Sequence, residues 1–400
     1  MKNDLVDRGL IKQSTCDIDR LFAKPFTFFL GIDPTADSIH VGHLLPIITA
    51  KRLIDLGHKA IILIGGSTAM IGDPTGRSTG RNALSKEQVD SNVAKLTEQV
   101  KSIIDCEIVN NADWTCNLNF LDFMQSTGSH FRVNNMIKSD CFKSRLEQEN
   151  GLSFLEFSYM LLQANDFHHL FVNHGCTVQI GGNDQTANMI AGIDLIHKKL
   201  HKEAFSFTVP LLTDSNGEKF GKSAGNAIWL DENKTSVFDF FQFWRNVSDD
   251  MVKSLLLMFT FKTIEEVDQL MSGDINVAKK ELAFVVTSIV HSVKKAVVAK
   301  SKAEALFEGG NGESLEATEI ESGTKLFDLL VTLGVCKSKN DGRRLAQQNG
   351  LTIDEVIVKE NVEFTKEKFL SSFVLRKGSK TFFKLKVKLN EPQSVPQSYS

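Results

Sequence analysis

Two stretches that end in a pair of glycines mark the first half of the chain. Residues 59–66 read KAIILIGG and residues 176–182 read CTVQIGG. The first is a continuous apolar run, which is typical of a strand that is buried on both faces of a parallel sheet, and the second is a similar transition from a strand to glycine. Because helical patterns lie between the runs, the sequence predicts strand–helix–strand units in an α/β, doubly wound parallel sheet of the Rossmann-like kind. Such folds bind ligands at the carboxyl ends of their strands.

A third run leads into polar residues and then into a helix. Residues 29–43 read FLGIDPTADSIHVGH, and the apolar LLPII follows at 44–48. This pattern predicts a strand, a turn and a helix start, whose unpaired N–H groups can receive phosphates beside His40 and His43. Gly42 would let a flat base approach the backbone closely. Two histidines that merely share one helix face are an equally good interpretation of this motif alone.

A helical insertion is predicted between about residues 115 and 165. At its end, Tyr159, Gln163 and Asp166 stand at i, i+4 and i+7, so one face of an apolar helix carries three polar groups. Buried polar groups need partners. A bound amino acid would supply them, and the alternative is a satisfied polar patch inside the core.

The second half predicts helices followed by a separate module. A glycine-rich and acidic stretch precedes the module and is typical of a flexible linker. The predicted parts are a catalytic domain with the insertion at 1–232, a helical domain at 233–307, a linker at 308–323, a small α+β module at 324–390 and a flexible tail at 391–400.

Composition narrows the classes of protein. The chain has 400 residues, of which 42% are hydrophobic, which suits a globular protein of two or three domains. No apolar run approaches the roughly 18 residues that a membrane span needs, and the first residues predict neither a secretory signal nor an organellar presequence. Its six cysteines form no CxxC pair. We therefore expect free thiols in a reducing compartment and no metal site held by the protein.

Charge is distributed unevenly along the chain. The formal net charge is −3, but residues 324–390 hold 14 Lys and Arg against 7 Asp and Glu, which leaves −10 for the remainder. Phosphate binding depends on local positive charge, so a basic module on an acidic body is a plausible arrangement for docking RNA. A solvated charged face is the alternative. The module resembles S4-like RNA-binding domains, and its expected docking edge carries Lys337, Lys339, Arg343 and Arg344.

A second motif, far along the chain, gives the HVGH motif at residues 40–43 its meaning. Residues 219–223 read KFGKS, a glycine-containing loop with two cations and a hydroxyl. Together the two motifs resemble the phosphate-handling motifs of class I aminoacyl-tRNA synthetases, and the rest of the chain from about residue 5 to 389 resembles the tyrosyl-tRNA synthetases of bacteria and mitochondria. The tightest matches are GIDPTADSIHVGH, GDPTGR, EFSYMLLQANDF, QIGGNDQ and KFGKSAGNAIWLD.

This resemblance implies a tyrosine–tRNA ligase that activates L-tyrosine with ATP and then charges tRNA(Tyr). Residues that the resemblance assigns to phosphates and catalysis are Thr35, His40, His43, Arg77, Arg81, Lys219, Lys222 and Ser223. Those assigned to ATP binding are Gly31, Asp33, His43, Gly182, Asp184, Leu212 and Lys222. Mg²⁺ is expected with ATP and held mainly by phosphate oxygens and water, since the sequence presents no dedicated carboxylate cage.

The resemblance also assigns a tyrosine pocket. Asp73, Tyr159 and Gln163 are expected to bind the substrate's ammonium group, and Gln185 its carboxylate. Asp166 would accept the phenolic hydroxyl. Phe29 occupies a position where the family normally has a tyrosine that also contacts this hydroxyl, so selection of tyrosine is expected to depend mainly on Asp166.

Two other functions remain open at this point. A class I synthetase for another aromatic amino acid would leave Asp166 unpaired, at a cost of a few kcal/mol. A non-catalytic RNA-binding descendant, such as a splicing factor, is disfavoured because both phosphate motifs are intact. By resemblance the helical domain would bind the anticodon, and the protein would be a homodimer that pairs through the insertion. Residues 223–227 (SAGNA) resemble the mitochondrial branch, which favours the mitochondrial matrix, with the bacterial cytoplasm as the alternative.

Overall fold

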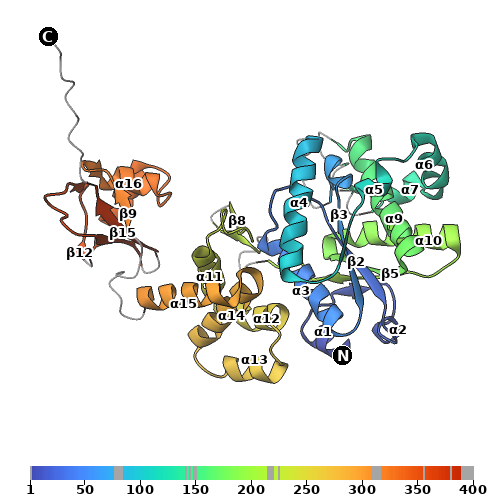
Figure 1. Cartoon of the computed structure of the whole chain (residues 1–400), viewed down its shortest axis with the longest axis horizontal. Helices are drawn as coiled ribbons and strands as arrows, with labels where there is room; N and C mark the ends of the chain where they lie inside the picture. The colour runs from blue at the N-terminus through green and yellow to red at the C-terminus, as the bar shows by residue number, and fades with distance from the viewer. Residues whose placement is uncertain are drawn as a thin grey trace, which may run out of the picture. The chain divides into compact units, whose positions relative to one another are not determined.

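The computed structural model divides the chain into two compact units, Met1–Ala296 and Val297–Ser400 (Figure 1). It describes residues 2–75, 84–139, 142–143, 146, 151–213, 220–223, 226–307, 317–354, 356–378 and 381–388. Within these residues, no helix combines the length and the apolar character that crossing a membrane requires.

A six-stranded sheet organises the first unit. Its strand order is β1-β6-β5-β2-β3-β4. The five strands from β6 to β4 are parallel, and only the short β1 runs antiparallel, against β6. The predicted doubly wound parallel sheet is confirmed. The strands are β1 Gln13–Ser14, β2 Thr27–Ile32, β3 Lys59–Ile64, β4 Glu107–Asn110, β5 Cys176–Gly182 and β6 Phe205–Val209.

Helices cover both faces of this sheet (Figure 1). On one face, Phe29 and Ile61 from the strands pack against Phe167 and Ile196 from α9 and α10, in a core that excludes water. The helix α9 begins with a capping box of Ser153 and Glu156, which satisfies its first N–H groups. The four main helices are α3 Val41–Asp55 and α4 Lys86–Ile103 on one face, and α9 Phe154–His174 and α10 Thr186–Leu200 on the other.

The order of the strands creates a crevice. From β2 the chain moves outward through β3 to β4, and it later returns to β5, on the other side of β2, and moves outward to β6. Loops that leave β2 and β5 at their carboxyl ends therefore turn in opposite directions. In open α/β sheets this switch point is where ligands bind.

Shorter elements complete the first unit, except that residues 297–307 of its last helix, α15, are assigned to the second unit. Buried aromatic side chains, among them Phe240, Trp244 and Phe259, hold its helical part together. The remaining elements are α1 Lys2–Asp7, α2 Ile18–Leu21, α5 Ala112–Thr115, α6 Phe120–Ser126, α7 Val133–Met136, β7 Lys222–Ser223, β8 Asn226–Ala227, α11 Val237–Arg245, α12 Val252–Phe259, α13 Ile264–Met271, α14 Ile275–His291 and α15 Val293–Phe307, together with 3₁₀ turns at Thr68–Met70, Gly128–His130, Asn183–Gln185 and Asp249–Met251.

Two buried arginines join the sheet to the helical part. Arg8 donates to the carbonyl of Lys262 at 2.7 Å, and Arg52, near the end of α3, donates to the carbonyl of Thr260. These carbonyls follow α12, where a helix leaves its last C=O groups unpaired. Burial lowers the pKa of Arg52 to about 10, so the guanidinium stays charged at neutral pH. Asp4 receives the Nε–H of Arg8 at 2.6 Å and balances part of the charge.

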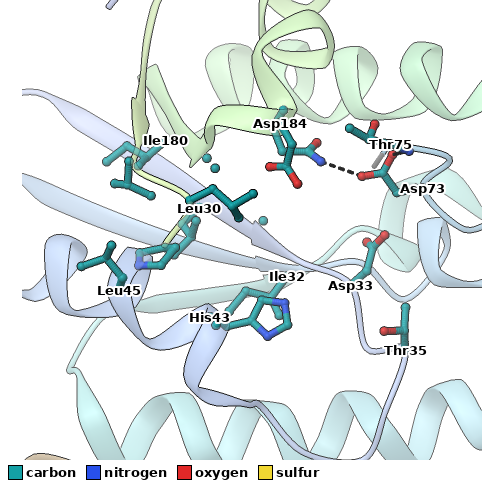
Figure 2. A pocket seen from close by; sticks show the side chains of 18 of the residues that line it. Leu30, Ile32, Asp33, Thr35, His43, Leu45, Asp73, Thr75, Ile180 and Asp184 are labelled. Atoms are coloured by element: carbon teal, nitrogen blue, oxygen red, sulfur yellow. Dashed lines mark hydrogen bonds between the residues drawn. The ribbon is translucent and has the colours of Figure 1, made fainter. Parts of the chain in front are cut away.

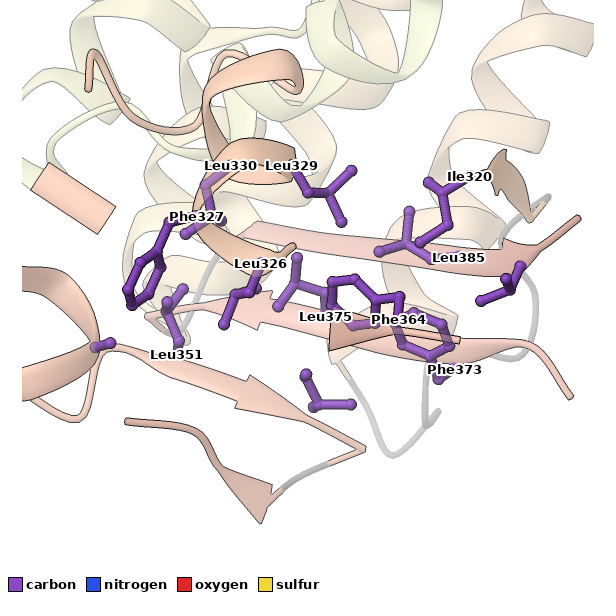
Figure 3. Close-up of a cluster of buried hydrophobic side chains, with 13 residues drawn as sticks. Ile320, Leu326, Phe327, Leu329, Leu330, Leu351, Phe364, Phe373, Leu375 and Leu385 are labelled. Carbon is purple, nitrogen blue, oxygen red and sulfur yellow. The ribbon is translucent and has the colours of Figure 1, made fainter. Parts of the chain in front are cut away.

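The second unit is a small sheet covered by two helices. Its five-stranded order is β12-β11-β14-β15-β9, and Leu326, Phe364, Phe373 and Leu385 are among the side chains that meet in its core (Figure 3). The elements are β9 Thr318–Ile320, β10 Thr324–Lys325, α16 Leu326–Thr332, α17 Lys339–Gln347, β11 Leu351–Ile353, β12 Val356–Ile357, β13 Glu363–Phe364, β14 Phe373–Lys377 and β15 Thr381–Val387.

One boundary differs from the sequence prediction. Residues 308–323 were expected to be linker, but Thr318–Ile320 forms β9, which pairs in parallel with β15. Ile320 is 7% exposed and belongs to the core of the module. Three strand residues in an acidic stretch carry too little pattern to reveal a strand, and only their burial against the sheet defines them. Residues 308–316 lie outside the described part.

Candidate active site

A cavity of about 1010 Å³ opens at the switch point between β2 and β5. Its size suits a nucleotide together with a small second ligand. Figure 2 shows Asp33, Asp73 and Asp184, which come from three separate segments, with their carboxylates turned toward the same opening. The sequence-predicted residues that line the cavity are Phe29, Gly31, Asp33, Thr35, His40, His43, Asp73, Tyr159, Gln163, Asp166, Gly182, Asp184, Gln185 and Leu212.

Some predicted residues have no described side chain. Arg77, Arg81 and Lys219 lie outside the described residues. For Lys222 and Ser223 the structure gives the backbone, which forms β7 and pairs with β8. Their expected roles at the phosphates stay predictions.

The backbone does bring the two phosphate motifs together. Ile228 donates its N–H to the carbonyl of Gly221 at 2.8 Å, and Val41 donates its N–H to the carbonyl of Ile228 at 2.9 Å. Gly221 has φ +94°, and a Cβ there would lie 3.2 Å from the Gly42 nitrogen. A side chain at this position would therefore meet both backbone strain and a crowded helix start. The loop that carries the second motif thus packs directly on the first.

The start of α3 differs in one respect from the sequence interpretation. His40 is the N-cap, and its Nδ1 accepts the N–H of Gly42 at 3.0 Å, so this N–H is already used. A Cβ on Gly42 would lie 2.8 Å from Cε1 of His40. Glycine is thus needed here because the ring of His40 folds over it, and the approach of a base is not required to explain it. The ring of His43 lies beside that of His40, with centroids 4.1 Å apart.

Asp33 is held by two hydroxyl groups at the end of β2. Tyr159 donates to its Oδ2 at 2.8 Å and Thr68 to its Oδ1 at 2.7 Å. Burial, and next the nearby Asp33, raise the pKa of Tyr159 well above its ordinary value, so the phenol stays protonated and remains a donor. Gly65 makes room for this arrangement, since a Cβ there would lie 2.0 Å from Oδ1 of Asp33. The sequence assigned Asp33 to the nucleotide and Tyr159 to the amino acid, and the structure joins these two side chains by a hydrogen bond.

Asp73 and Gln185 form a second linked pair. Gln185 donates its Nε2–H to Oδ2 of Asp73 at 2.6 Å, while the N–H of Thr75 donates to Oδ1 at 2.9 Å. Asn188 in turn donates to Oε1 of Gln185 at 3.0 Å. Together with Asp33, Asp73 gives this side of the cavity negative charge, which favours a cationic group such as an ammonium.

Asp166 is a buried carboxylate in the wall of the cavity, whose lining also includes the apolar side chains of Phe29 and Leu63. It is 3% exposed, and Phe29 packs on the adjacent Phe167 with ring centroids 5.2 Å apart. Asn111 donates to its Oδ2 at 2.9 Å and Trp114 donates its indole N–H to Oδ1 at 2.8 Å. Burial raises the pKa of Asp166 to about 7, although these two donors act in the opposite direction. A flat ring that carries one hydroxyl can donate to such a carboxylate.

Sequence reasoning missed three residues that hold these carboxylates, namely Thr68, Asn111 and Trp114. Asn111 directly follows β4, and a polar residue at the carboxyl end of a parallel strand was a usable signal. Thr68 lies in the glycine-bounded loop after β3, where the same signal applies. Trp114 follows no such pattern. Gln179 from β5 is also 3% exposed in this wall, and within the described chain its Oε1 has no hydrogen-bond partner.

Within the described ranges, no group of three or more His, Cys, Asp and Glu side chains is arranged to hold a metal ion. In the second unit, Lys337, Lys339, Arg343 and Arg344 are all exposed at the start of α17. Two of them have acidic neighbours, since Lys339 contacts Asp328, and Arg344 lies 3.3 Å from Asp341.

Comparison with known proteins places this geometry among tRNA synthetases. Residues 22–308 match the model of the family described as tRNA synthetases class I (W and Y). The tyrosine–tRNA ligase of Clostridium kluyveri is 46% identical over 401 residues, covering 96% of this chain and 98% of that protein. That of Caldanaerobacter subterraneus is 45% identical over 402 residues, with the same coverage.

Solved structures agree with these matches. A C-terminally truncated mitochondrial tyrosyl-tRNA synthetase from Aspergillus nidulans is 31% identical, with a TM-score of 0.70 over 76% of this chain and 94% of that one. A tyrosyl-tRNA synthetase from Archaeoglobus fulgidus, 14% identical with a TM-score of 0.57, covers 74% of this chain and 99% of its own, and shares the fold.

Proposed function

The chain belongs to the class I tRNA synthetase family of the tryptophan and tyrosine enzymes, and on that premise we propose that it is a tyrosine–tRNA ligase. It activates L-tyrosine with ATP, giving tyrosyl-adenylate and pyrophosphate, and transfers the tyrosyl group to the 3′ end of tRNA(Tyr). The observation that carries the choice of tyrosine is Asp166, a buried carboxylate in the wall of the cavity.

Tyrosine is favoured over the other aromatic amino acids by hydrogen bonding. A phenolic hydroxyl can donate to Asp166, whereas phenylalanine offers nothing to the carboxylate. Leaving a buried acceptor without its ligand partner costs about 1–3 kcal/mol, and more for a charged group. Phe29 supplies no second hydroxyl contact, so Asp166 and the donors that orient it supply most of the discrimination.

Activation requires no nucleophile from the protein. A carboxylate oxygen of tyrosine attacks the α-phosphorus of ATP, a new O–P bond forms, and the bond from the α-phosphorus to the bridging oxygen of pyrophosphate breaks. Positioning and charge stabilisation supply the catalysis. Thr35 and His40 would donate to the departing pyrophosphate, and Lys222 would close over it from the second motif, with Lys219, Ser223, Arg77 and Arg81 assisting. Mg²⁺ enters with ATP, held by phosphate oxygens and water.

The remaining cavity residues hold the two substrates. Asp73, Tyr159 and Gln163 receive the ammonium group of tyrosine, which the negative side of the cavity supports. Gln185 would turn from Asp73 to orient the carboxylate. The nucleotide occupies the part of the cavity lined by Gly31, Asp33, His43, Gly182, Asp184 and Leu212.

We assign RNA binding to the parts outside the sheet. The helical segment 233–307 would contact the anticodon, and the basic module would bind RNA through α17 and its neighbours, as an S4-like domain. Local charge of +7 between residues 324 and 390 supports this assignment.

The protein would act as a homodimer. Large apolar side chains of the insertion are exposed, as in Phe120 at 66%, Leu121 at 73% and Phe154 at 66%. Exposed apolar side chains gathered on one segment are typical of an interface that a second copy covers.

The compartment follows the relatives. Those that are 42–46% identical come from bacteria such as Clostridium, Caldanaerobacter and Fusobacterium. The mitochondrial matrix, which residues 223–227 favoured, has no support from these relatives, and the bacterial alternative agrees with them. We therefore propose the bacterial cytoplasm.

An ATP–pyrophosphate exchange assay with each of the twenty amino acids tests the function. Exchange should depend on tyrosine, and charging of tRNA(Tyr) should follow when the tRNA is added. Exchange driven by tryptophan or phenylalanine instead would contradict the substrate. Binding of tRNA without exchange for any amino acid would point to the non-catalytic RNA-binding protein.

A further inference from the structure

Asp166 is held by two donors that differ in how firmly they are themselves fixed. Asn111 is fully buried, accepts the N–H of Ser67 at 2.8 Å, and donates to Thr68 at 3.1 Å as well as to Asp166. These bonds leave its amide one orientation. Trp114 is only half-buried, and among the described residues its indole N–H bonds to Asp166 at 2.8 Å.

The element that carries Trp114 adds little restraint. Its helix α5 has only four residues, Ala112–Thr115. Among the described contacts, the side chain of its N-cap residue, Asn111, makes no bond to it, and at its start the N–H of Ala112 donates to Oδ1 of Asn110 at 3.0 Å. So short a helix is marginal without tertiary contacts. The orientation of the indole must therefore come from what its ring touches.

Trp114 packs against a buried cluster that includes Phe167 and Leu170. His169 adds a stacked contact to this packing, because its imidazole lies on the indole of Trp114 with ring centroids 4.2 Å apart and planes 10° from parallel. Asp166 and His169 are three residues apart on α9, so they are neighbours on one face of this helix. The indole spans the pair, with its N–H at the carboxylate and its face on the imidazole.

The imidazole is held in turn from the next turn of α9. The amide of Asn173 lies 3.3 Å from Nδ1 of His169 and donates to the carbonyl of His169 at 3.0 Å. His168, its neighbour in sequence, makes no ring contact with Trp114 among the described contacts, and its Nε2 is buried without a partner. The stack is therefore specific to position 169.

We propose that His169 is a positioning residue for substrate selection, which acts through Trp114 to aim the indole N–H at Asp166. This proposal rests on the proposed tyrosine–tRNA ligase function. Removing the stack lets the indole turn, and Asp166 then loses one of its two donors and the geometry with which it meets the phenolic hydroxyl. His169 is not among the described residues that line the cavity, and its described side-chain contacts are with Trp114, Asn173 and His174.

Four variants of the full chain test this in pyrophosphate exchange. His169→Ala should raise the KM for tyrosine and lower the ratio of kcat/KM for tyrosine over phenylalanine, each by about 2- to 13-fold, the range for one aromatic pair. The KM for ATP should not change. His169→Phe keeps a flat ring on the indole and should restore both values, whereas His169→Leu fills the space without stacking and should not. His168→Ala is the matched control and should behave as the original chain.

The outcomes separate this inference from the function. Absence of tyrosine-dependent exchange in the original chain overturns the proposed function. If the original chain is active, unchanged tyrosine KM and unchanged ratio in His169→Ala overturn the positioning role, as does an equal loss in His168→Ala. Should His169→Ala not fold, equal behaviour of the Phe and Leu variants overturns it, because only stacking distinguishes them.

Discussion

The titration of Asp166 should make the choice between tyrosine and phenylalanine depend on pH. Burial raises its pKa from an ordinary value of 3.8 to about 7. The folded-state pKa is raised, so the carboxyl is neutral below about pH 7 and charged above it. The charged form is the stronger acceptor for the phenolic hydroxyl. Tyrosine should therefore be preferred more strongly as the pH rises.

The size of the effect follows from the pKa. With a value of about 7, roughly a tenth of the carboxyl groups are charged at pH 6 and roughly nine-tenths at pH 8. If only the charged form selects tyrosine, kcat/KM for tyrosine rises up to about tenfold over this range. Phenylalanine gains nothing from the charge, so the ratio of the two kcat/KM values should rise by a similar factor.

Pyrophosphate exchange with both amino acids between pH 6 and pH 8 measures this ratio. Titration of ATP and of the substrate's α-amino group affects both amino acids alike and cancels in the ratio. Asp166→Asn has no group to titrate at this position and should give a ratio that is independent of pH. A constant ratio in the original chain, or one that falls as the pH rises, would refute the assignment of Asp166 as the ionised acceptor.

Three further outcomes are expected. Phe29→Tyr adds a hydroxyl beside the expected position of the substrate's phenol. Since a neutral hydrogen bond contributes about 0.5–1.5 kcal/mol, the preference for tyrosine over phenylalanine should rise about 2- to 13-fold in exchange kinetics. A loss of tyrosine activation would mean that the pocket is built around phenylalanine. Lys222→Ala should slow single-turnover adenylate formation on the order of 10²-fold with little change in tyrosine affinity, because the charge it meets develops on pyrophosphate; an unchanged rate would remove Lys222 from the mechanism. A chain of residues 1–316, which removes β9 with the rest of its sheet, should keep pyrophosphate exchange while charging of tRNA weakens. The loss relative to the full chain should be largest at low salt and shrink as salt rises, because the module's phosphate contacts are themselves weakened by salt. If both steps fall together, the module supports the catalytic unit structurally.

The sheet was predictable because its strands are buried on both faces. A parallel strand between two helix layers is mostly apolar, so the run at residues 60–64 predicts a strand without any tertiary information, and the glycine pair that ends residues 176–182 repeats the signal. The ends of these strands then locate the cavity, through the switch point. β9 was not predictable, since three residues at the edge of a small sheet have no period to detect, and only its pairing with β15 gives it a role.

Within the site, identities were easier to predict than connections. The spacing of Tyr159 and Asp166 places both on one helix face, and both do line the cavity. That Tyr159 donates to Asp33, 126 residues earlier, depends on how the loop after β2 meets α9. The role of Trp114 was even harder to predict, because its neighbours in a four-residue helix give no sign of it. Only its contacts with Asp166 and His169, which lie on another helix, indicate what the indole does.

Arg8 and Arg52 donate to carbonyls that follow α12, and these bonds limit which segments can be exchanged between this protein and a relative. An exchange of the helical segment alone would confront two buried guanidiniums with foreign carbonyl positions, and an unpaired buried charge costs several kcal/mol. Arg52 is carried by α3, the same helix that begins at His40. A chimera that folds must therefore take α1, α3 and α12 from one parent. These three helices have to be exchanged together, although they lie far apart in the sequence.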